Sequence, residues 1–314
     1  MATRDDRQWP DIAYERWRDT CATLHMWSQI VGKIRLAQTP WLNHSWHVAL
    51  YVTARGLTTS PIPYGERVFQ IDFDFIDHQL LVQVNDGARR AMRLAPISVA
   101  AFRRELFDHL SELGLHIRIH GTPNEVMEPI PFAEDEIHAS YDAEAANRYW
   151  RALVQSDRVL KQFRDGFVGK SSPVHFFWGS FDLALTRFSG RTAPQHPGGV
   201  PNCPDWVTRE AYSHEVSSFG FWPGNDAFPH PVFYAYAYPE PPGYGSTIHS
   251  DVAEYNDTFR EFLLPYDVVR RSSSADGTLL AFFQSCYEAA ADLGRWDRTA
   301  LERKDFPFLG HHPR

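Results

Sequence analysis

The chain has 314 residues, of which 43% are hydrophobic and 22% are charged, a composition that excludes a disordered or fibrous protein. Its formal net charge is −8, and it has no run of Lys and Arg, so a nucleic-acid-binding protein is not expected. No apolar stretch approaches the roughly 20 residues that span a bilayer, so we also expect no membrane segment.

The cysteines and the N-terminus favour a cytoplasmic protein. Cys21, Cys203 and Cys286 are odd in number and far apart, so neither a disulfide framework nor a structural zinc site is expected. Residues 1–10 are polar and lack the apolar region of a secretory signal. Aromatic residues reach 14% beside 15 His, which is typical of a rigid core or of the walls of a small-ligand pocket.

Hydrophobic periodicity predicts the elements of the first half of the chain. In chain order they are a helix over 11–37, strands over 46–54, 68–75 and 78–84, a helix over 99–113, and a strand over 115–120. The second and third strands are predicted to form a hairpin through Ile76 and Asp77. The Pro-rich acidic stretch 122–135 that follows is predicted to be a linker.

The second half repeats this order loosely. Its predicted elements are a helix over 142–160, a strand or bent strand pair over 174–188, strands over 214–222 and 232–238, and a helix over 279–293. Asp142 and Asp276 are the predicted N-caps of the two helices. Residues 190–204 are rich in Pro and Gly and predict a loop.

These elements predict an α+β fold of two similar sheet-and-helix halves, residues 1–135 and 136–314, packed around a central cleft. One continuous domain is the alternative. Each half has a cluster of Arg, Gly, Thr and Pro after its first strand, at 55–61 and 190–194, which favours an internal duplication. The similarity of the two halves has a second explanation, because such orders of helices and strands are common among α/β proteins.

Strand alternation predicts where polar side chains gather. In the first half, one face of the sheet is apolar, and the other carries polar residues such as His47, Tyr51, Arg55, Asp72 and Asp74. This polar face either lies in water or meets the second half and lines a cleft. We expect that this face lines a cleft, since the second half has two strand faces with side chains suited to the opposite wall. One face carries Tyr234, Tyr236 and Tyr238, and the other carries Glu215, Ser217, Phe219 and Phe221.

One row of polar residues lies on the first predicted helix. His25, Gln29 and Lys33 are spaced four residues apart, so they share one side of an otherwise apolar segment. Such a row is usually solvated. Here it is followed by Asn43, His44 and His47, which would bring further polar groups to the end of the helix.

No strict motif for a metal, a nucleophile or a nucleotide is present. Imidazole and carboxylate ligands suit zinc or iron, and the candidate sets are His44 with His47, His175 with Asp182, and Glu210, His214 and Glu215 with His230. His214 and Glu215 lack the second His of H-E-x-x-H. Residues 166–171 end in Gly-Lys-Ser, but Arg164 stands where a phosphate loop needs its first Gly.

Several long strings resemble an uncharacterised, mostly bacterial family of proteins of unknown function. They are residues 23–37, 43–48, 55–63, 172–182 and 210–218. The resemblance runs from about Trp17 to Trp296 and implies a single family-wide unit. It implies no catalytic residue.

The predicted function is a small-molecule enzyme with a cleft lined by His, Arg and aromatic residues, with a divalent metal as an optional cofactor. His47, His175 and His214 are the predicted acid/base groups or ligands, and Asp182 or Glu215 would orient a His. The predicted substrate-binding residues are His25, His44, Arg55, Trp178, Arg187, Tyr234 and Tyr236, the arginines holding an anionic group. The alternatives are a non-catalytic ligand-binding or interaction module and a structural homo-oligomer, and the oligomeric state stays open.

Overall fold

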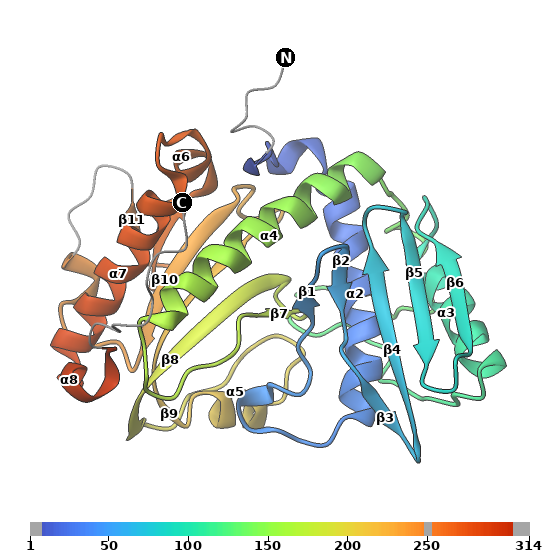
Figure 1. Cartoon of the computed structure of the whole chain (residues 1–314), viewed down its shortest axis with the longest axis horizontal. Coiled ribbons are helices and arrows are strands. Elements are labelled where there is room, and N and C mark those ends of the chain that lie inside the picture. The colour runs from blue at the N-terminus through green and yellow to red at the C-terminus, as the bar shows by residue number, and fades with distance from the viewer. Residues whose placement is uncertain (1–7, 248–252, 304–314) are drawn as a thin grey trace.

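The computed structural model describes residues 8–247 and 253–303, and within these ranges two six-stranded antiparallel sheets carry the fold (Figure 1). Helices cover one face of each sheet, so the predicted α+β class is confirmed. No helix in these ranges combines the length and the apolar character needed to cross a membrane.

The N-terminal sheet has the strand order β1-β2-β4-β5-β6, and β3 pairs with β4. Its strands are β1 (Tyr51–Val52), β2 (Gly56–Thr58), β3 (Ile62–Tyr64), β4 (Arg67–Asp74), β5 (Gln79–Val84) and β6 (Arg89–Arg93). Its apolar face packs under the helices α2 (Arg18–Gln38) and α3 (Val99–Glu112), which lie behind the sheet in Figure 1. The short 3₁₀ helices η1 (Tyr14–Arg16) and η2 (Asn43–Ser45) flank α2.

The C-terminal sheet has the order β11-β12-β10-β9-β8-β7. Its strands are β7 (His175–Phe177), β8 (Asp182–Thr192), β9 (His214–Trp222), β10 (Val232–Tyr238), β11 (Glu254–Asn256) and β12 (Glu261–Pro265). The long helices α4 (Ala143–Asp165) and α7 (Ala275–Leu293) pack on one face only, the front face in Figure 1. The shorter helices are α5 (Asp205–Ala211), α6 (Tyr266–Arg271), α8 (Arg298–Leu301) and η3 (Tyr244–Ser246).

The strongest sequence patterns predicted their elements well. The hairpin of β4 and β5 is confirmed, β9 and β10 have the predicted bounds, and Asp142 caps α4 by accepting a hydrogen bond of 2.9 Å from the Ala145 N–H. The N-cap of α7 is Ser274, so the prediction of Asp276 was wrong. The predicted strand over 115–120 is irregular, and of residues 46–54 only β1 and the bridge at Leu50 pair.

The polar face of the N-terminal sheet faces solvent. Gln70 and Gln83 each donate a hydrogen bond of 2.9 Å to Asp72, so these groups satisfy one another at the surface. The expectation that this face meets the second half was therefore wrong, and the alternative holds because an antiparallel sheet needs cover on one face only. The halves instead meet where α2 and the stretch 122–126 approach the open face of the C-terminal sheet.

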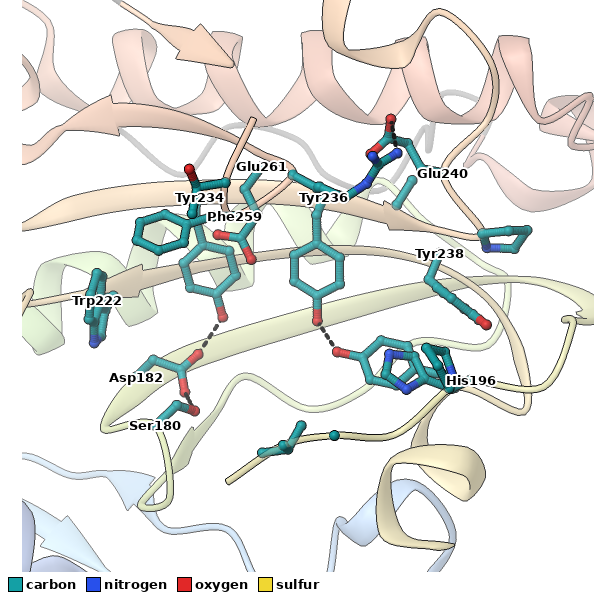
Figure 2. A pocket seen from close by; sticks show the side chains of 18 of the residues that line it. Ser180, Asp182, His196, Trp222, Tyr234, Tyr236, Tyr238, Glu240, Phe259 and Glu261 are labelled. Atoms are coloured by element: carbon teal, nitrogen blue, oxygen red, sulfur yellow. Dashed lines mark hydrogen bonds and ion pairs between the residues drawn. The ribbon is translucent and has the colours of Figure 1, made fainter. Parts of the chain in front are cut away.

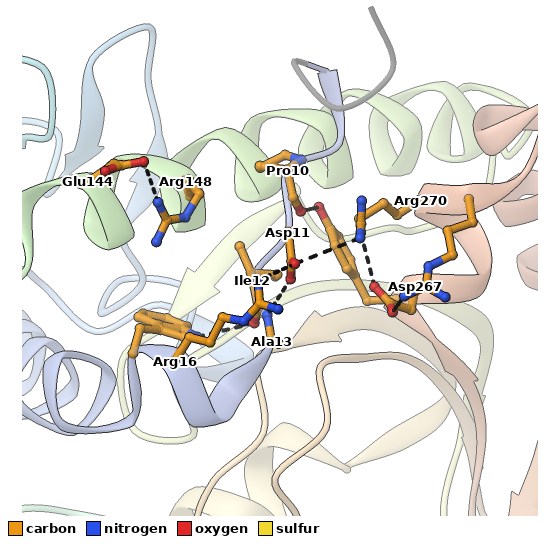
Figure 3. Close-up of polar contacts among 12 residues, drawn as sticks. Pro10, Asp11, Ile12, Ala13, Arg16, Glu144, Arg148, Asp267 and Arg270 are labelled. Atoms are coloured by element: carbon orange, nitrogen blue, oxygen red, sulfur yellow. Dashed lines mark hydrogen bonds and ion pairs between the residues drawn. The ribbon is translucent and has the colours of Figure 1, made fainter. Parts of the chain in front are cut away.

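The two halves share one apolar core. Leu50 and Phe176 exchange two backbone hydrogen bonds of 2.8 Å, which link the sheets edge to edge. The start of the described chain also reaches the C-terminal half: the Tyr266 hydroxyl donates to the Pro10 carbonyl at 2.9 Å, and Arg270 lies 3.9 Å from Asp11 (Figure 3). A boundary at residue 135 stays a prediction, as does the duplication.

Candidate functional site

A groove crosses the face of the C-terminal sheet that α4 and α7 leave uncovered. It has a wide part of about 1060 Å³ and a narrow part of about 490 Å³. The two parts are connected because both are lined by Ser180, Asp182, Tyr212, Tyr234 and Tyr236. These volumes are sufficient for a small-molecule ligand.

Strand alternation decides which side chains face the groove. Successive residues of a strand point to opposite faces, so every second residue of β8, β9, β10 and β12 lines the groove floor. These residues are Asp182, Ala184, Thr186, Ser218, Trp222, Val232, Tyr234, Tyr236, Tyr238, Glu261 and Leu263. The residues between them, such as Phe219 and Phe233, pack against Phe283 of α7.

The floor is organised around the carboxylate of Asp182. The Ser180 hydroxyl donates to its Oδ1 at 2.7 Å, and the Tyr234 hydroxyl donates to its Oδ2 (Figure 2). Tyr234 lies on β10 and reaches β8 by passing over Gly220 of the intervening strand. A Cβ at Gly220 would lie 2.3 Å from the Tyr234 ring, so only glycine permits this crossing.

Two further carboxyl groups enter the groove from other segments. Glu125 belongs to the Pro-rich stretch that follows residue 121, and its carboxylate lies over Gly179, where a Cβ would be 2.0 Å from Oε1. Glu261, at the start of β12, lines the wide part beside Tyr234 and Tyr236 (Figure 2). Neither carboxylate forms an ion pair within the part of the chain that the structure describes.

Crowding by the groove walls favours the neutral form of these acids. Desolvation and the negative charge of Asp182 raise the pKa of Glu125 to about 7. The same causes raise the pKa of Glu261 to about 8. Burial raises the pKa of Asp182 as well, although its hydrogen bonds from Tyr234 and Ser180 oppose the shift. At neutral pH, Glu261 therefore keeps most of its proton, and Glu125 exists in both protonation states.

The polar row of α2 forms the back of the narrow part. Gln29 exchanges two hydrogen bonds of 2.8 Å with the backbone of Asn124, and His25 contacts the Gly179 carbonyl at 2.8 Å. Lys33 donates to the Asn124 side chain and lies 5.7 Å from the centre of the Trp178 ring. The row is therefore buried and positions the segments that carry Glu125 and Asp182.

Unusual backbone conformations gather along the groove. Several lining residues other than glycine have a positive φ: His44, Ser45, Glu125, Asn202 and Arg260. Such conformations are costly for residues with a side chain and are concentrated at functional sites. A hydrogen bond connects the stretch with Glu125 to a second loop, since the backbone N–H of Glu125 donates to the Pro201 carbonyl at 2.8 Å.

Comparison with known proteins places the chain in one family. The model of a family of unknown function, DUF5996, matches residues 9–303. The chain belongs to this family. The predicted resemblance is thereby confirmed, and the strings 23–37, 43–48 and 172–182 contribute Lys33, His44 and Asp182 to the groove of this DUF5996 protein. No curated protein and no solved structure matches the chain.

The structure brings several of the predicted site residues together. Asp182, Trp178, His44, Tyr234 and Tyr236 line the groove. His25 lies beneath it, where burial lowers its pKa to about 4 and so keeps the imidazole neutral. His47 is one step removed, since its ring packs on the Trp41 side chain with centroids 4.3 Å apart.

The other predicted histidines do not meet at the groove. His175 is 1% exposed on β7, among Trp46, Tyr51 and Phe177, and burial lowers its pKa to about 3. His214 begins β9, with its ring 6.0 Å from that of His44. The predicted convergence of His47, His175 and His214 on one bound group is not seen.

The predicted arginines and Glu215 have partners elsewhere. Arg55 pairs with Asp74 and Asp77 on the N-terminal sheet, at 2.7 and 2.6 Å. Arg187 points to the same side of β8 as Leu183 and Leu185, which is the face under α4. There its guanidinium stacks 3.6 Å from the centre of the Phe163 ring. Glu215 pairs with Arg191 at 2.6 Å. Neither arginine can hold an anionic group in the groove.

Glu125, Lys33, Glu261, Ser180 and Tyr212 were missed as site residues. Glu125 lies in a stretch without periodicity, which predicts a linker, and β12 is too short to show alternation. A signal for Lys33 was present in its row with His25 and Gln29. In residues 8–247 and 253–303, no group of three or more His, Cys, Asp and Glu side chains is placed to hold a metal ion.

Proposed function

We propose that this protein is an enzyme that acts on a small molecule in the groove, with Glu125 and Asp182 as its acid/base groups. The observation that carries the proposal is the pair of carboxyl groups, delivered by two distant segments to either side of Ser180 in an aromatic-lined groove. Titratable groups with shifted pKa values in a cleft are typical of catalytic sites.

The two carboxyl groups suit different roles. Glu125, with a pKa of about 7, exists in both protonation states at neutral pH and can give or take a proton with little driving force. Asp182 is held by two hydroxyl donors, Ser180 and Tyr234, which fix its orientation. An acid/base group that is held by fixed hydrogen bonds keeps its position relative to a bound substrate, and proton transfer requires such a fixed position.

The lining indicates an uncharged or cationic substrate. Three carboxyl groups (Asp182, Glu125 and Glu261) face the groove against one lysine, Lys33, among its described lining residues, and Arg260 at its rim is paired with Glu240 at 2.8 Å. An anionic substrate would add negative charge beside these carboxyl groups. Trp178 and Trp206 in the narrow part, and Trp222 in the wide part, offer ring surfaces for the apolar portion of a ligand.

The test is a turnover screen with neutral and amine-containing metabolites. We expect the wild-type protein to convert at least one compound, and Glu125→Gln and Asp182→Asn to lower kcat by about 100-fold or more. Glu128→Gln is the matched control, because Glu128 lies on the same stretch but does not line the groove. The pH profile of kcat/KM should show an ionisation near 7 that is absent in Glu125→Gln.

The outcomes separate this proposal from its alternatives. Equal rates for the wild-type protein and both carboxyl variants would refute the assignment of Glu125 and Asp182. A compound that binds in the groove and is released unchanged would instead support a ligand-binding module. Light scattering on the same sample tests the homo-oligomer, which a monomeric result would exclude.

A further inference from the structure

We propose that Lys33 is a covalent catalytic residue that forms an imine with an aldehyde or ketone bound in the narrow part of the groove. This inference rests on the proposed function and names the class of its substrate. It assigns the buried end of the polar row on α2 a chemical role, in addition to its contact with Asn124.

The surroundings of Lys33 differ from those of a structural lysine. The residue is 3% exposed, yet it lines the narrow part together with Trp178, Glu125 and Cys203. Its amine donates to an amide oxygen, and it forms no ion pair with a carboxylate in the described ranges. A buried ammonium without a carboxylate partner is costly, and such lysines serve as nucleophiles.

The other lysines provide an internal comparison. Lys161 is paired with Asp157 at 2.6 Å on α4, and Lys170 contacts the His44 ring at 2.6 Å outside the groove lining. The sequence contains one more, Lys304, which lies outside the described residues. Among the described lysines, Lys33 is therefore the one that lines the groove.

The protonation state of Lys33 supports this chemistry. Burial lowers its pKa to about 8, with a weaker opposing effect of the Cys203 thiol. At pH 7, roughly a tenth of the amine would then be neutral, about two orders of magnitude more than for an ordinary lysine. Only the neutral amine carries the lone pair that attacks a carbonyl carbon.

The groove supplies the proton transfers of imine formation. The Lys33 nitrogen attacks the carbonyl carbon, a C–N bond forms, and the carbonyl oxygen takes a proton from the protonated carboxyl of Glu125. The ionised carboxylate then accepts a proton from the nitrogen. Glu125 then gives a second proton to the hydroxyl, the C–O bond breaks and water leaves, so that the protonated imine and the Glu125 carboxylate remain. Glu125 is placed for this role, since it lines the narrow part together with Lys33 and is the chain neighbour of Asn124, whose side chain accepts the hydrogen bond of Lys33.

The test is trapping with propionaldehyde and sodium cyanoborohydride at pH 7. Hydride from the reagent reduces the imine carbon and leaves a propyl group on the nitrogen, which peptide mapping by mass spectrometry locates. We expect labelling of Lys33 to exceed that of Lys161 and Lys170 by at least 10-fold. Denaturation in urea before labelling should remove this preference, because burial no longer shifts the amine.

Variants distinguish this inference from the proposed function. Lys33→Met should abolish turnover of a carbonyl substrate, while Lys170→Met, the control, should keep it. Equal labelling of all three lysines in the folded wild-type protein would overturn the role of Lys33, even if a variant failed to fold. If Glu125→Gln abolishes turnover and Lys33→Met does not, the role of Lys33 would also be overturned, and the proposed function would still hold. Labelled Lys33 with turnover unaffected by Glu125→Gln would refute the acid/base assignment instead.

Discussion

Replacing Glu261 by Gln should stabilise the protein in a pH-dependent manner. The Glu261 carboxyl faces the groove beside Tyr234 and Tyr236, with the Asp182 charge nearby and no ion-pair partner among the described residues. Glutamine keeps the shape of the side chain and cannot ionise. The substitution therefore removes the cost of a crowded negative charge and leaves the packing of β12 in place.

The sign and size of the effect follow from the raised pKa. Below about 4.5, Glu261 is protonated in both the folded and the unfolded chain, so the two proteins should be equally stable. As pH rises from 4.5 to about 8, the unfolded chain ionises while the folded protein keeps its proton, so wild-type stability falls. The full shift corresponds to at most about 5 kcal/mol, and solvent screening of this partly exposed group reduces it to about 2 kcal/mol.

Urea unfolding at pH 5 and pH 8 measures this difference. The free energy of unfolding of Glu261→Gln should exceed that of the wild-type protein by about 2 kcal/mol at pH 8 and by less than about 0.5 kcal/mol at pH 5. Glu254→Gln on the neighbouring strand β11 is the control, because Glu254 is exposed. A pH-independent difference, or a less stable variant at pH 8, would refute the crowded, unpaired state of Glu261.

Three other substitutions test how the site is supported. Gly32→Ala should lower stability by about 1–3 kcal/mol in thermal unfolding, because the new Cβ would lie 2.2 Å from the Trp178 ring, and an unchanged melting temperature would contradict this packing. Asp142→Ala should cost about 1 kcal/mol through loss of the N-cap of α4, whereas Asp142→Asn should retain most of it. Arg187→Met should leave kcat and KM unchanged, since the guanidinium stacks on Tyr287 on the opposite face of the sheet; a large rise in KM would restore its predicted role in substrate binding.

The sequence predicted helices and strands correctly where a periodic hydrophobic pattern was long and its ends were marked by capping or turn residues. Asp142 before an amphipathic stretch predicted the start of α4, and alternation in residues 214–222 and 232–238 predicted β9 and β10. Short strands such as β11 and β12 were missed, because three to five residues do not establish a period and their pairing partners lie far along the chain.

The same distinction holds for the site. Alternation correctly placed Tyr234 and Tyr236 on one face of β10, but it could not say which face of the sheet the helices would cover. That choice depends on the packing of α4 and α7, and it sends Arg187 into the core and Asp182 into the groove. A strand determines only which residues share a face, whereas burial of that face is a property of the whole fold.

The sequence by itself thus determined the α+β class, the family and the alternating faces of the main strands, since these depend on local patterns. Only the tertiary structure brought Glu125, Lys33 and Asp182 to one groove. Glu125 comes from an irregular stretch and Lys33 from a helix row that resembles a solvated face. Contacts between residues separated by about 100 positions leave no periodic signal, because they arise from chain packing and not from neighbours in the sequence.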